Sequence, residues 1–65
     1  MKVMTEFVPN DVDYLTAGKV YELHNQMQYK GNDIGMIFDD TNEGLTIRLD
    51  KCAHIGFKPW TMIDE

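Results

Sequence analysis

The sequence has little cysteine and no long apolar run. Cys52 is the only cysteine among 65 residues, so no internal disulfide can form and the usual staple of small secreted domains is missing. No stretch approaches the ~20 apolar residues of a membrane span, and residues 1–9 hold too short an apolar run for a signal peptide. These absences predict a protein of a reducing cytoplasm that does not enter a membrane.

Positive charge is also scarce, because six Lys and Arg side chains stand against eleven Asp and Glu, giving a formal net charge of −5. Such a field repels phosphates and anionic membrane surfaces. The six cations are spread along the chain. The sequence therefore predicts no binding of double-stranded nucleic acid, and an acidic surface that serves solubility or, alternatively, attracts a basic partner.

The clearest pattern that is present is a β-hairpin over residues 34–49. Apolar and polar residues alternate from Leu45 to Leu49, the period of two that places one face on a core. Residues 39–44, Asp-Asp-Thr-Asn-Glu-Gly, are of the types that favour a chain reversal. The facing core row is expected to be Ile34, Met36 and Phe38.

Further turn signals divide the rest of the chain into short strands. Strands are expected at residues 2–8, 20–24, 34–38, 45–49 and 60–63. Gly18 suits a positive-φ turn, 30–33 suits a tight turn, and 50–56 has room for one 3-10 turn. The segment 20–24 suits a strand bent between two sheets. The sequence thus predicts an all-β fold: one domain over residues 1–65, a small five-stranded SH3-like barrel with a short 3-10 turn before the last strand.

Catalytic chemistry has little support in these residues. Cys52 and His54 form the only pair of metal-ligand types, whereas a structural zinc site needs four ligands. The acidic residues of the 39–44 turn lack the length and spacing of a calcium loop, which leaves a solvated tip or a recognised surface as alternatives. We therefore expect no enzyme activity, no catalytic residues, no metal and no cofactor.

Aromatic side chains are the stronger candidates for binding. The chain has more of them than a five-strand core must hold, so some are expected on the surface, where aromatics anchor protein interfaces. The surplus set is Tyr14, Tyr21, Tyr29, Phe57 and Trp60. Arg48, the only arginine, is expected on the outer side of a central strand, where its planar group suits a carboxylate or phosphate. The candidate binding residues are Tyr14, Tyr21, Arg48, Lys51 and Trp60.

A family resemblance is carried by residues 14–23, Tyr-Leu-Thr-Ala-Gly-Lys-Val-Tyr-Glu-Leu. The hairpin, residues 49–55 and Trp60 follow this segment and belong to the same pattern. The pattern resembles small phage and prophage proteins that have an SH3-like barrel and mostly unassigned roles. The resemblance covers nearly the whole chain after Asp13, and its motifs are structural. It implies an accessory phage protein made in a bacterial cytoplasm that acts by binding.

Two functional hypotheses follow. The first is a non-enzymatic binding protein that engages a host or phage protein through a β edge or an aromatic patch. The alternative is an oligomer that encloses a small anionic, nucleotide-like ligand, with Arg48 and Lys51 at the subunit boundary. A homo-oligomer is expected in either case, because a short barrel with open edge strands can complete itself by pairing.

Overall fold

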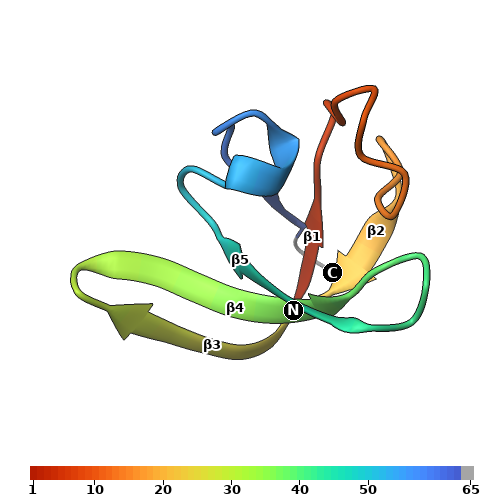
Figure 1. The fold of residues 1–65 in the computed structure, drawn as a ribbon. Helices are drawn as coiled ribbons and strands as arrows, with labels where there is room; N and C mark the ends of the chain where they lie inside the picture. The colour runs from red at the N-terminus through yellow and green to blue at the C-terminus, as the bar shows by residue number, and fades with distance from the viewer. Residues whose placement is uncertain (64–65) are drawn as a thin grey trace.

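The computed structural model describes residues 1–63 and is all-β (Figure 1). Its six strands form two three-stranded antiparallel sheets. The first sheet has the order β2-β1-β6, with β1 at Lys2–Met4, β2 at Val20–Glu22 and β6 at Thr61–Ile63. The second has the order β3-β4-β5, with β3 at His24–Tyr29, β4 at Asn32–Phe38 and β5 at Gly44–Arg48. A 3-10 turn, η1 at Ala53–Ile55, precedes β6.

The all-β class, the 34–49 hairpin and the 3-10 turn before the last strand are confirmed. The predicted strand count and closed barrel are wrong, because residues 1–63 form six strands in two sheets and no closed barrel. The additional strand is β3, whose side chains are almost all exposed and show no apolar alternation. Strand β2 ends at Glu22, and Leu23 carries the chain from the first sheet into the second.

The turns have the backbone geometry that their residue types favour. Lys30 and Gly31 join β3 to β4 with φ of 51° and 79°, so both central residues of this two-residue turn are left-handed, as in a type I′ hairpin. Gly18 has the predicted positive φ, 81°. At the β4–β5 turn, Asn42 is left-handed and its N–H donates to the Asp39 carbonyl at 2.9 Å. These turns fix the register of both hairpins.

The hydrophobic core lies between the two sheets and is closed by η1 and the segments beside it. Its buried apolar members are Val3, Leu15, Tyr21, Leu23, Ile37, Ile47, Cys52, Ile55 and Trp60. The Tyr21 and Trp60 rings meet edge to face, with centroids 6.0 Å apart. Tyr21 of β2 and Trp60, the residue before β6, therefore meet inside the core as an aromatic pair.

The prediction for the inner face of β4 is wrong by one residue. Gly35 and Ile37 point inward, opposite Ile47 and Leu45 of β5, whereas the row of Ile34, Met36 and Phe38 points outward. The inward glycine has a packing reason: a Cβ added at Gly35 would lie 2.5 Å from Cδ1 of Leu23. The core needs the space that glycine leaves, so the β4 face with Gly35 and Ile37 is turned inward and the more apolar row of Ile34, Met36 and Phe38 is turned outward.

Candidate interaction surface

Two of the predicted binding residues, Tyr21 and Trp60, lie in the core rather than on the surface. Both are buried, and their rings pack against each other. The Trp60 Nε1 group is buried with no hydrogen-bond acceptor among residues 1–63. The Tyr21 hydroxyl accepts from the Thr16 N–H at 2.8 Å and donates to Asp40 at 2.8 Å. The structure therefore gives these two side chains internal partners and no exposed face.

Asp40 is the centre of the densest polar network. Its carboxylate accepts hydrogen bonds from Lys19 Nζ at 2.7 Å, from Thr16 Oγ1 at 2.6 Å and from the Tyr21 hydroxyl. The Lys19 and Thr16 bonds lower the pKa of Asp40 from 3.8 to about 2, while burial raises the pKa of Tyr21. The Asp40 N–H also donates to the Tyr14 carbonyl at 2.9 Å. This network ties the 14–19 loop to the β4–β5 turn.

Tyr14 is half-buried and pairs with the 3-10 turn. Its hydroxyl lies 2.7 Å from Nδ1 of His54, and the two rings meet edge to face at 5.8 Å. Cys52 is buried in the core beside this turn. Within residues 1–63, no group of three or more His, Cys, Asp and Glu side chains is placed to hold a metal ion. The Tyr14–His54 contact thus joins η1 to the 14–19 loop.

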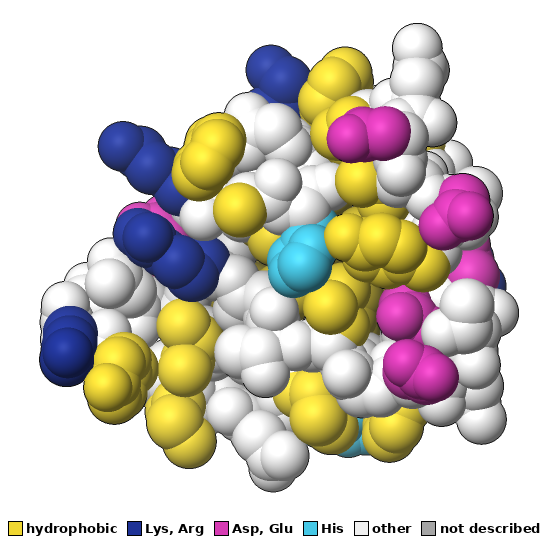
Figure 2. All heavy atoms as spheres, in the orientation of Figure 1, with side chains coloured by type: hydrophobic (Ala, Val, Ile, Leu, Met, Phe, Trp, Pro, Cys, Tyr) yellow, Lys and Arg dark blue, Asp and Glu magenta, His cyan; other side chains and the backbone are white. Residues whose placement is uncertain are grey.

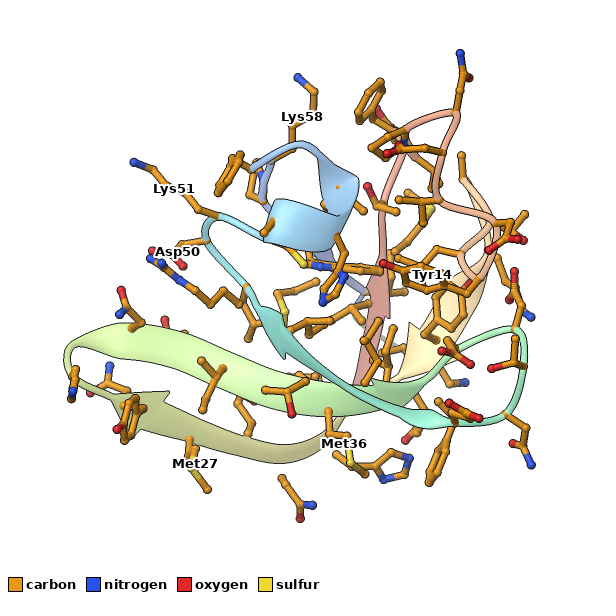
Figure 3. All side chains as sticks on the ribbon, viewed as in Figure 1. Tyr14, Met27, Met36, Asp50, Lys51 and Lys58 are labelled. Atoms are coloured by element: carbon orange, nitrogen blue, oxygen red, sulfur yellow. The ribbon has the colours of Figure 1, made fainter. Side chains whose placement is uncertain are left out.

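Arg48 and Lys51 lie on the exposed side of the molecule near the β3–β4 hairpin. Nη2 of Arg48 donates to Oδ1 of Asn32 at 2.9 Å, and Nε lies 3.6 Å from Oδ1 of Asp50. Lys51 is exposed, and its side chain, like that of Lys58, extends outward from the segment around η1 (Figure 3). The space-filling view shows most Lys and Arg atoms on one side and most Asp and Glu atoms on the other (Figure 2). The fold thus gathers cations that are dispersed in sequence.

A hollow of about 480 Å³ opens beside this basic side. It is lined by Thr5, Glu6, Phe7, Lys58, Pro59 and Thr61. The segment after β1 is held by Thr5, whose Oγ1 donates to the Phe7 carbonyl at 2.9 Å and accepts from the Phe7 N–H at 3.3 Å. The Lys58 ammonium lies 5.3 Å from the centre of the exposed Phe7 ring, within cation–π range. Two segments far apart in sequence thus present a cation and an aromatic ring together.

Phe57 directly precedes Lys58, which lines this hollow, and its backbone has an unusual conformation. Its φ is 61°, in the left-handed region that bulky side chains rarely adopt, and 69% of its surface is exposed. Two backbone hydrogen bonds with Cys52 close the turn that imposes this geometry. The Cys52 carbonyl accepts from the Phe57 N–H at 2.8 Å, and the Cys52 N–H donates to the Lys58 carbonyl at 3.0 Å. The preceding Gly56 is also left-handed and lies against the Phe7 ring.

Phe7, Phe57 and Lys58 together form what we call the aromatic–cationic surface. Sequence reasoning named Phe57 among the surplus aromatics but placed Phe7 in the first strand, which ends earlier, at Met4. The available signal was the run Gly56-Phe57-Lys58-Pro59, in which glycine ends a turn and proline prevents a regular strand before residue 60. That run predicts an irregular, exposed segment, and with it an exposed ring.

Comparisons with known proteins do not assign this surface. No protein-family model matches the chain, and no similar protein was found among curated proteins or solved structures. Within residues 1–63, no helix is long and apolar enough to cross a membrane. The aromatic–cationic surface is therefore interpreted from its geometry alone.

Proposed function

We propose that the chain is a non-enzymatic binding protein that engages a partner protein through the aromatic–cationic surface. The observation that carries this proposal is the backbone of Phe57. A bulky residue in the left-handed region costs about 1–2 kcal/mol, and a ring that is 69% exposed regains little of that cost within the fold. Gly or Asn would satisfy the same turn with less strain. A contact with another molecule supplies a reason to keep the ring.

The chemistry of this surface indicates what the partner presents. The rings of Phe7 and Phe57 offer apolar contact area of the kind that anchors protein interfaces. The Lys58 ammonium beside the Phe7 ring calls for an acidic group, and charges at an interface rim fix orientation and speed association. Glu6 also lines the hollow and repels a carboxylate that approaches it. The expected partner segment places an apolar side chain next to an Asp or Glu.

The resemblance to phage proteins suggests where such a protein would act and which partner it would meet. We propose an accessory protein of the phage type, related to SH3-like barrels, that meets a host or phage protein in a bacterial cytoplasm. The alternative of a nucleotide-like ligand held by Arg48 and Lys51 has less support. Asn32 and Asp50 already engage the Arg48 guanidinium, so an anion would have to displace them.

Affinity capture from bacterial lysate tests the proposal. The wild-type chain and a Tyr29→Ala control, which removes an exposed ring elsewhere, should retain the same specific protein, and Phe57→Gly should lose it. With that protein purified, calorimetry should show Phe57→Gly weakening binding by roughly 30-fold, as expected for an interface hot spot. Lys58→Ala should reduce the salt dependence of binding.

Two results would contradict the proposal. One is retention of the same partner with unchanged affinity by Phe57→Gly. The other is loss of the partner with Tyr29→Ala while Phe57→Gly still binds, which would move the interface to the second sheet. Glycine is used at position 57 because it suits the left-handed backbone, so lost binding cannot be attributed to misfolding of the turn.

A further inference from the structure

The outer face of the β3-β4-β5 sheet is a second exposed apolar surface. Its apolar side chains are Met27, Tyr29, Ile34, Met36 and Phe38. Three of them, Met27, Tyr29 and Phe38, keep between 47% and 57% of their surface exposed. Met27 and Met36 extend from the same side of the sheet, away from the core (Figure 3). A face of this kind on a 65-residue chain is the type of surface that marks an interface.

This face is not flat, because a hollow interrupts its row of apolar side chains. A hollow of about 190 Å³ is lined by Asn25, Met27, Ile34, Gly35, Met36 and Thr46. The Met36 side chain lies over Gly44 of β5, since a Cβ added to this glycine would be 3.2 Å from the Met36 sulfur atom. Methionine side chains adapt to irregular apolar surroundings, so two facing copies of this relief could interlock.

The two ends of the face carry opposite charge. The exposed Lys30 occupies the β3–β4 turn and supplies the positive charge of one end that is unpaired within residues 1–63, whereas Arg48, opposite Ile34, is already paired with Asp50. The other end is the β4–β5 turn, where Asp39 and the exposed Glu43 follow Phe38. The face is therefore an apolar strip with a basic end and an acidic end.

We propose that the occupant of this face is a second copy of the chain, packed face to face and antiparallel about a two-fold axis between Ile34 and Met36. In this arrangement, Lys30 of each copy lies beside Glu43 of the other, whereas a parallel arrangement would bring like charges together. The proposal uses a different surface from Phe57 and goes beyond the proposed function. It replaces pairing of edge strands with pairing of sheet faces.

The size of the face sets the strength of this dimer. With about 3.3 Å per residue along β4 and about 4.8 Å between strands, the face measures roughly 23 by 14 Å, or about 300 Å² of flat area. A stable specific interface buries about 800 Å² per partner. The dimer is accordingly weak and depends on concentration, and its terminal charge pairs make it sensitive to salt.

Sedimentation equilibrium from about 10 µM to 1 mM, a range suited to weak association, tests the proposal. The neighbouring residues Met27 and Gln28 provide matched variants, since they lie on opposite faces of β3. Met27→Lys should weaken the dimer at least tenfold, and Gln28→Lys should leave it unchanged. Because both variants add the same charge to the same exposed strand, circular dichroism should show both folded.

Charge exchange tests the orientation. Lys30→Glu and Glu43→Lys should each weaken the dimer severalfold, and the double variant should restore it. A monomer throughout the concentration range would overturn the proposal, as would a dimer unaffected by Met27→Lys, which would indicate pairing through the β3 edge. Failure of the double variant to restore association would overturn the antiparallel arrangement. None of these outcomes depends on Phe57, so the proposed function stands or falls separately.

Discussion

At position 57, glycine should give a more stable protein than alanine, which is the reverse of the order at ordinary exposed positions. The residue combines a φ of 61° with a ring of which about a third of the surface is covered. Full burial of a Phe side chain is worth up to about 3 kcal/mol, so the covered part contributes about 1 kcal/mol. Phe57→Ala loses this contribution and keeps the strained backbone. We expect it to lower the free energy of unfolding by about 1 kcal/mol.

Phe57→Gly also loses the ring contact but relieves the left-handed strain, worth about 1–2 kcal/mol. The greater freedom of glycine in the unfolded chain offsets about 0.5–1 kcal/mol of that gain. The glycine variant should therefore be close to wild type in stability and about 1 kcal/mol more stable than the alanine variant. Both variants should lose partner binding equally, since neither has the ring.

Urea denaturation followed by Trp60 fluorescence measures this order, because Trp60 is the only tryptophan and is buried. Gln28, an exposed position of β3, serves as the control. There glycine should be less stable than alanine by about 0.5–1 kcal/mol. If glycine is also the less stable variant at position 57, the backbone of Phe57 is not strained and the reasoning behind the proposed interface is refuted.

Three further predictions concern the network and the core. The lowered pKa of Asp40 means that its ionised form adds stability above pH 3.8 that is lost as the pH falls toward 2. Asp40→Asn should lower the free energy of unfolding by about 1 kcal/mol at pH 7. In urea titrations at pH 2–7 it should also remove the part of the acid-induced loss of stability that Asp40 causes. An unchanged pH profile would contradict this prediction. Gly35→Ala should cost about 1–3 kcal/mol through the clash with Leu23, and Leu23→Val should reduce that cost in a double-mutant cycle. Trp60→Phe should lower the free energy of unfolding by well under the roughly 3–5 kcal/mol typical of Trp→Ala, because it also removes a buried N–H that has no acceptor. Thermal denaturation measures this difference.

The sequence carried enough information for the class of fold and for the turns. The 34–49 hairpin followed from alternation on β5 and from turn residues, both of which are local. Which face of β4 points inward could not be predicted in this way, because the sequence of β4 has one row of apolar residues and one row that contains Gly35. Only the position of Leu23 in the folded core shows that the glycine points inward. Strand β3 was missed for a related reason, since an exposed strand needs no apolar period.

The surface residues were harder to predict than the fold. Tyr21 and Trp60 were candidates for an exposed patch, yet their rings complete the core because the two short sheets leave a gap that large side chains fill. Phe7 and Phe57 are exposed instead: Phe7 follows the end of β1 at Met4, and Phe57 lies in the left-handed turn after Gly56, neither of which residue counts express. The grouping of cations is likewise a product of the fold and not of sequence spacing (Figure 2).

The division of the strands between the two sheets implies an order of folding. The second sheet is a continuous meander from His24 to Arg48, so each of its pairings closes only a short loop. The first sheet joins residues 2–4 to 20–22 and to 61–63. We expect pulse-labelling hydrogen exchange to show protected amides in β4 before β1, with simultaneous protection contradicting this order. Strand β1, although near the beginning of the chain, gains its second neighbour only when β6 arrives.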